Sequence, residues 1–129
     1  MATSLQASNA ILSSGVDGIG YSTGAGGTVT QITSKATGVT LNKICGAITL
    51  NNAALGAVTA VTFAVTNSAC AVGDIIVVNH SSAGTNGAYL VKGGLAAAGS
   101  FTITVYNNTV GILSEAIVVS FAIIKGVSA

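Results

Sequence analysis

Short apolar runs recur along the chain from Thr28 onward, separated by clusters of Gly, Asn, Ser and Ala residues. In segments 61–66 and 101–105 the apolar residues occupy every second position, and threonine or alanine occupies the positions between them. This alternation is typical of a strand with one face in a core and the other in solvent. The pattern predicts about eight strands, which span Thr28–Thr33, Val39–Asn42, Ala47–Leu50, Val58–Thr66, Asp74–Asn79, Ala88–Lys92, Phe101–Asn107 and Ala116–Lys125.

Two of these strands are apolar at consecutive positions. They read DIIVV at Asp74–Val78 and AIVVSFAII at Ala116–Ile124. A strand with continuous apolar residues is typical of one that is buried on both faces. In a small two-layer domain the core covers only one of those faces. We therefore expect a neighbouring copy of the chain to cover the other face.

The rest of the pattern indicates a single domain of the all-β class. Alanine-rich segments such as GGLAAAG are broken by glycine, so no helix of ordinary length is predicted. A chain of 129 residues is long enough to enclose one core. We therefore expect residues 28–129 to form one small β-sandwich or barrel.

Residues 1–27 differ in composition from the rest of the chain, because they are mostly small and polar. Such a segment has few apolar side chains with which to order itself. We expect an extended N-terminal arm that becomes ordered against a partner surface. The arm residues expected to make this contact are Leu5, Ile11, Leu12, Ile19 and Tyr21.

Charged residues are scarce: four lysines, no arginine and three acidic residues make up 5% of the chain, against about 25% in an average soluble protein. A surface with so few charges is poorly protected against association. A membrane-spanning helix needs about 20 consecutive apolar residues, whereas the run Ala116–Ile124 has the length of a strand. We therefore expect no membrane partner, and we expect other protein to cover much of the surface.

Several functional classes lack the residues that they need. Nucleic-acid binding depends on clustered Lys and Arg, and the four lysines are scattered. Catalysis needs a constellation of groups, whereas Asp17, Asp74 and Glu115 are far apart in sequence and His80 is the only histidine. The same shortage of ligands argues against a zinc site. We expect neither an enzyme, nor a metal site, nor a nucleic-acid partner.

The stretch GIGYSTGAGGTVTQ, residues 18–31, is rich in glycine. A phosphate-binding loop needs a strand before its glycines and a helix after them. Here small polar residues precede the glycines and β-branched residues follow them. The stretch therefore predicts a flexible lead into the first strand, and no nucleotide or other cofactor is expected.

The chain begins with MATSLQASNAILSS, which has neither the basic region nor the long apolar region of a secretory signal. Synthesis in a cytoplasm is therefore expected. Cys45 and Cys70 are expected there as reduced, buried thiols, although two cysteines alone leave a disulfide open.

The loop NHSSAGTNGAY, between Asn79 and Tyr89, is the most polar stretch of the chain. Its ring, amide and hydroxyl groups are of kinds that can bind a saccharide. Its Gly, Asn and Ser residues are equally typical of a turn, which is the simpler interpretation. The sequence leaves both interpretations open.

Three stretches of the chain resemble a family of small β-rich phage virion proteins: GIGYSTGAGGTVTQITSKATGVTLNK, AITLNNAALGAVTAVTFAVTNSACAVGDIIVVNHSSAGTNGAY and AIVVSFAIIK. Members occur as capsid decoration (cement) proteins and as modules of fibre or spike proteins. The resemblance covers residues 18–125. It implies a homotrimeric, jelly-roll-like β domain on the exterior of the virion, and it implies no catalytic residues.

The function implied is that of a capsid decoration protein, made in the host cytoplasm, which binds the major capsid protein on the outer surface of the capsid and stabilises it. The alternative is a tail-fibre or head-spike module that attaches to the host surface. The chain contains no coiled-coil or repeat stalk, which favours the first function. The residues expected at the trimer interface are Ile76, Val78, Val118, Phe121 and Ile123.

Overall fold

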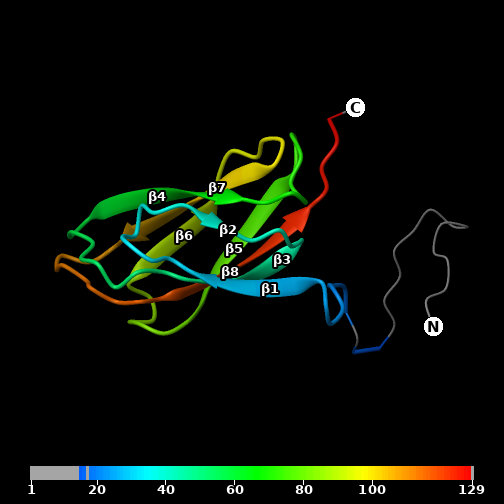
Figure 1. Cartoon of the computed structure of the whole chain (residues 1–129). Coiled ribbons are helices and arrows are strands. Elements are labelled where there is room, and N and C mark those ends of the chain that lie inside the picture. Colours follow the sequence, from blue (N-terminus) through cyan, green and yellow to red (C-terminus); the bar gives the residue numbers. More distant parts are fainter. Residues whose placement is uncertain (1–14, 17, 129) are drawn as a thin grey trace, which may run out of the picture.

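The computed structural model of the chain describes residues 15, 16 and 18–128. These residues form eight strands and no helix, which confirms the all-β class (Figure 1). The first sheet has the order β1-β3-β8-β5, and its strands span Gly26–Thr30, Cys45–Thr49, Val118–Ile124 and Ile75–Ser82. The second has the order β2-β4-β7-β6, and its strands span Val39–Thr40, Thr59–Thr66, Ser100–Asn107 and Tyr89–Gly93.

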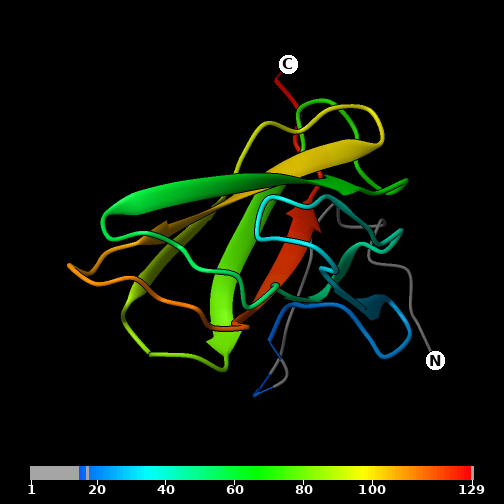
Figure 2. The same cartoon turned by 60° about the vertical axis from the view of Figure 1, so that its left-hand side comes forward.

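The two sheets face one another as the layers of a sandwich. Figure 2 shows β4 and β7 running across β5 and β8 of the other layer. The chain changes sheet at each step from β1 to β5, which leaves β1 parallel to β3 and β2 parallel to β4. A jelly roll consists of two antiparallel Greek keys, so we describe the fold only as a two-sheet, sandwich-like arrangement.

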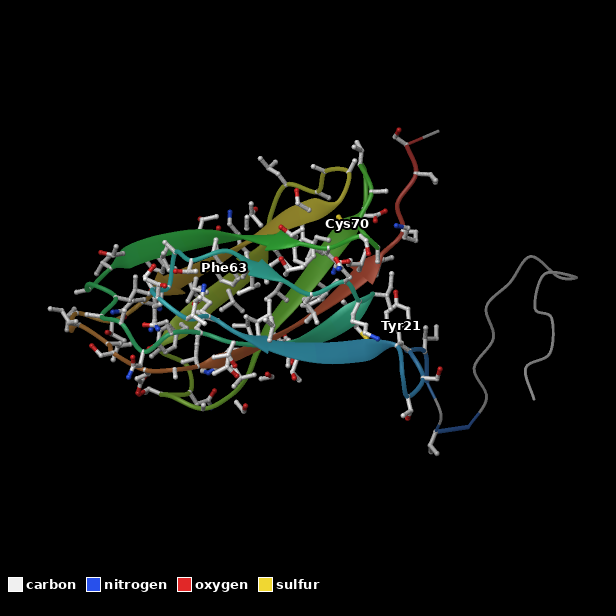
Figure 3. All side chains as sticks on the ribbon, viewed as in Figure 1. Tyr21, Phe63 and Cys70 are labelled. Carbon is white, nitrogen blue, oxygen red and sulfur yellow. The ribbon has the colours of Figure 1, made fainter. Side chains whose placement is uncertain are left out.

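The core lies between the sheets and contains the alternate residues of their strands. Phe63, Val65 and Ile103 project into it from the second sheet, and Ile48 and Val119 from the first; Figure 3 labels Phe63 among these packed side chains. The rings of Phe101 and Phe121 join the two layers with centroids 5.2 Å apart. The alternation in segments 61–66 and 101–105 therefore predicted the buried face of the second sheet correctly.

Glycine allows close approach of the two sheets where β5 meets β6. A Cβ atom at Gly93 would lie 2.4 Å from the carbonyl oxygen of Ile76. No real Cβ contact is that short, so a larger residue would push β6 away from β5. The sandwich is therefore drawn together along this edge, and its exposed faces lie on the outer sides of the two sheets.

The expected strands differ from the observed ones most at β5 and β1. The expected strand Asp74–Asn79 is too short, because β5 continues to Ser82, so the first residues of the expected polar loop belong to the strand. β1 begins at Gly26 and ends at Thr30, whereas the expected strand covered Thr28–Thr33. A tight turn, in which the Ala25 amide donates to the Ser22 carbonyl at 3.1 Å, leads directly into it. β-Branched residues favour extended backbone beyond Thr30, but the chain leaves the sheet there because Gln31 turns its side chain inward to bond Lys35 and Thr37.

Candidate functional site

The outer side of the first sheet is the most extensive surface without charge that the strand register defines. We call it the neutral face. It consists of the residues that alternate with the buried ones, and all of them are uncharged. They are Gly26, Thr28 and Thr30 from β1, Cys45, Ala47 and Thr49 from β3, Val118, Ser120, Ala122 and Ile124 from β8, and Ile75, Val77 and Asn79 from β5.

One corner of the neutral face carries large apolar side chains in solvent. Ile75 is 55% exposed, Val77 is 47% exposed and Ile124 is 50% exposed. Ile75 and Ile124 lie opposite one another in the β5–β8 register, and Val77 lies opposite Ala122. Cross-strand neighbours of this kind form one continuous patch. A single chain therefore leaves a patch of β-branched residues open to water.

The five residues expected at a trimer interface divide between the two sides of the sheet. Phe121 and Ile123 are 3% and 0% exposed and belong to the core of the chain itself. Ile76 and Val78 point the same way and pack against that core. Val118 alone lies on the neutral face. In a continuous apolar run the sequence does not indicate which alternate residues point outward. Four of the five residues expected at the interface therefore turn out to face the core of the chain.

The N-terminal segment meets the sandwich at the end of β8. The hydroxyl of Tyr21 donates a hydrogen bond to the carbonyl oxygen of Ile123 (Figure 3). Ile19, two residues earlier, is exposed. The other expected arm residues, Leu5, Ile11 and Leu12, lie outside the described residues. Tyr21 thus attaches the segment to the end of β8, an inner strand of the first sheet, while Ile19 is exposed to solvent.

The polar loop after β5 is held by one carboxylate. Glu115 accepts hydrogen bonds from the Thr85 amide at 3.0 Å, the Thr85 hydroxyl at 2.8 Å and the Tyr89 hydroxyl at 2.8 Å. The His80 ring meets the Tyr89 ring edge-on with centroids 5.6 Å apart, and His80 Nε2 lies 2.7 Å from the Ala83 carbonyl oxygen. An open hollow of about 210 Å³ lies above residues 80–84 and 86.

These contacts define the chemistry of the loop. The hydrogen bonds from Tyr89 and Thr85 hold the pKa of Glu115 below its usual value, so the carboxylate is ionised at neutral pH. Burial, together with the adjacent carboxylate, raises the pKa of Tyr89. The groups of the loop thus bond one another, as expected of an ordered turn. His80 and Asp74 lie toward opposite ends of β5, and Asp74 forms an ion pair of 2.5 Å with Lys125 there.

A second polar group, the Lys35 ammonium, lies within the fold. It donates to three backbone carbonyl oxygens, those of Asn51, Ala53 and Glu115, and the last two are 2.8 Å away. Burial lowers the pKa of Lys35, while the negative charge of Glu115 opposes that shift. The ammonium therefore ties three connecting segments together. In the sequence Lys35 is one of four scattered lysines, and no sequence pattern marks it as buried.

The two cysteines are free thiols. Cys45 lies on the neutral face, and Cys70 is buried near the loop that follows β4 (Figure 3). The Cys70 thiol is 3.4 Å from the Ser100 carbonyl oxygen, and burial raises the pKa of Cys70.

No protein-family model, curated protein or solved structure matches the chain. Within residues 15, 16 and 18–128, no helix is long and apolar enough to cross a membrane. The same residues contain no group of three His, Cys, Asp or Glu side chains placed to hold a metal ion. The candidate functional site is therefore the set of surfaces described above, chiefly the neutral face.

Acid should weaken the fold through Glu115. Its pKa is lowered in the folded chain, so its ionised form stabilises the fold at neutral pH, and this contribution is lost as the pH falls through the folded-state pKa. We expect the Tm to fall between about pH 5 and pH 3, and to fall less steeply in Glu115→Gln. Melting curves across this range test the expectation. The hydrogen-exchange rate of the Thr85 amide is the local readout, and it should rise in Glu115→Gln because this amide donates to Glu115.

Asp74→Asn is the matched control, since Asp74 is a second carboxylate with a lowered pKa in the part of the chain that the structure describes, and it lies at the other end of β5 from the loop. It should flatten the pH dependence of the Tm without accelerating exchange at Thr85. An unchanged Thr85 exchange rate in Glu115→Gln would contradict the proposed role of the carboxylate.

Proposed function

We propose that the chain is a structural phage virion protein: a homotrimeric decoration protein that binds the outer surface of a capsid and stabilises it. The observation that carries this proposal is the neutral face, with Ile75, Val77 and Ile124 half exposed on a surface that has no charged side chain. The resemblance of residues 18–125 to small phage virion proteins supports the same function.

Burial of the neutral face supplies a driving force for association. Complete burial of a Val or Ile side chain contributes roughly 1.5–3 kcal/mol, and these side chains are already half buried, so each adds about 1 kcal/mol. In a trimer every subunit contributes its own patch. Because no charge has to be desolvated on this face, little of the gain is offset.

Attachment to the capsid is assigned to the N-terminal arm. Tyr21 fixes the arm to the end of β8, and Ile19 is exposed beyond this point. Three arms on one trimer would bind the major capsid protein jointly, so a weak contact per arm gives a strong total attachment. Protein made in the host cytoplasm would reach the capsid exterior by direct assembly.

A charge on the neutral face should dissociate the trimer. In Val77→Asp an unpaired carboxylate would enter an apolar interface, which is strongly unfavourable. The single chain should still fold, because Val77 is half exposed in it. Sedimentation velocity should show a trimer for the original protein and single chains for this variant at the same concentration.

Val110→Asp is the matched control, because Val110 is 97% exposed on a loop away from the neutral face. It should remain trimeric. Single chains in all three samples would contradict the trimer, and trimers in all three would exclude the neutral face from the interface.

The capsid role is tested on phage particles that carry the protein. A decoration protein should be present in copy numbers on the scale of the capsomers, whereas a fibre or spike head is present in a handful. Deletion of residues 1–20 should leave the trimer folded, since β1 begins at Gly26, and should remove the protein from purified particles.

Salt is a useful second variable in this experiment. The contact is apolar, so decoration by the full chain should change little with ionic strength, unlike a contact between charged surfaces. A truncated protein that decorates capsids as tightly as the full chain would contradict the role of the arm. A handful of copies per particle would favour the fibre or spike function.

A further inference from the structure

The outer side of the second sheet carries a groove that the proposed trimer does not use. The groove has a volume of about 340 Å³ and lies over β4, β7 and β6. Ala60, Leu90, Val91, Lys92, Thr104 and Tyr106 line it, and we call it the Tyr106 groove. The second sheet is the opposite layer of the sandwich from the neutral face (Figure 2). A trimer formed through the neutral face would therefore leave this groove in solvent.

The first row of the groove is apolar. The register places Ala60, Tyr106 and Leu90 side by side across three strands. Leu90 is 58% exposed, and Tyr106 is half buried. An aromatic ring beside aliphatic carbon can pack against the apolar body of a ligand while its hydroxyl stays in water. This row therefore forms an apolar platform.

The adjacent row is polar. It contains Thr62, Thr104 and Lys92 in register across the same three strands. The hydroxyl oxygens of Thr62 and Thr104 are 2.8 Å apart, so one hydroxyl donates to the other. The accepting hydroxyl keeps its own proton, and both oxygens keep a lone pair. This pair can therefore exchange hydrogen bonds with hydroxyl groups of a ligand.

Lys92 supplies charge beside these hydroxyls. The one ion pair among the described residues joins Lys125 to Asp74, and Lys35 is enclosed by backbone carbonyls. Lys92 is exposed and has no carboxylate beside it in this part of the chain. No acidic residue lines the groove. The groove therefore favours an anion, held beside an apolar platform and a hydroxyl pair.

We propose that the Tyr106 groove binds an acidic saccharide, with one uronic acid residue as its unit of recognition. The apolar face of the sugar ring packs on Tyr106 and Leu90, its hydroxyls bond to Thr104, and its carboxylate pairs with Lys92. A fatty acid would leave the threonine hydroxyls unused. A neutral sugar would leave the lysine unused. The combination of an apolar row with a polar row selects a ligand that has both characters.

The experiment uses the full chain, isotopically labelled for NMR, with tetragalacturonic acid as the probe. Its methyl ester is the matched neutral probe, because it has the same rings and hydroxyls without the charge. At probe concentrations up to about 10 mM, which covers weak binding, we expect amide shifts confined to segments 60–62, 90–92 and 104–106. The ester should bind about tenfold more weakly, a difference of about 1.4 kcal/mol.

Variants identify the groups responsible. Lys92→Gln should weaken binding of the acid about tenfold and leave binding of the ester unchanged. Lys43→Gln, at an exposed lysine outside the groove, should change neither. Tyr106→Leu should weaken both probes, and melting curves establish that each variant is folded.

Three results would overturn the proposal. The first is the absence of shifts in the groove at the highest concentration of the acid. The second is equal binding of acid and ester, and the third is an equal loss in Lys92→Gln and Lys43→Gln, which would indicate nonspecific charge attraction. None of these results bears on the capsid role, because the groove and the neutral face lie on different sheets.

Discussion

Scarcity of charge is the constraint on which the account of this molecule depends. Four lysines and three acidic residues cannot cover the surface of a chain of 129 residues. Two of these seven, Asp74 and Lys125, are paired with one another, and the Lys35 ammonium is turned inward to backbone carbonyls. Threonine, alanine, glycine and β-branched side chains make up much of the surface. Their burial by another protein costs little desolvation free energy.

The outer sides of the two sheets differ in the kind of surface that they present. The neutral face has exposed isoleucine and valine and no polar group stronger than a hydroxyl or an amide, which suits contact with another copy of the chain. The outer face of the second sheet has a threonine pair, a tyrosine and a lysine in two rows, which suits a ligand that is itself mostly hydroxyl. Because Gly93 has no side chain, β6 packs closely against Ile76 of β5, and the two outer faces lie on opposite sides of a thin sandwich.

Local pattern predicted the strands well, because period-two alternation records which side of a strand is buried. Phe63, Val65 and Ile103 could be placed in the core from the sequence alone. The pairing of the strands could not be predicted from the sequence, because the parallel partners β1 and β3 are separated along the chain by a strand of the other sheet. The outward set of β5 also escaped prediction, because Ile75 and Ile76 are the same residue type and only the register distinguishes them. Nor did sequence spacing reveal that Lys92 and Thr104 share a row with Thr62.

Hydroxyl-radical footprinting of the native protein tests the central claim most directly, because it reports which aliphatic side chains meet water. Val110 and Ile112, both on an exposed loop, serve as internal references. If copies of the chain cover the neutral face, peptides that contain Ile75, Val77 and Ile124 should be labelled far less than their half-exposed state in a single chain requires. Labelling in proportion to those single-chain exposures would show that the neutral face is open to solvent and would contradict the account.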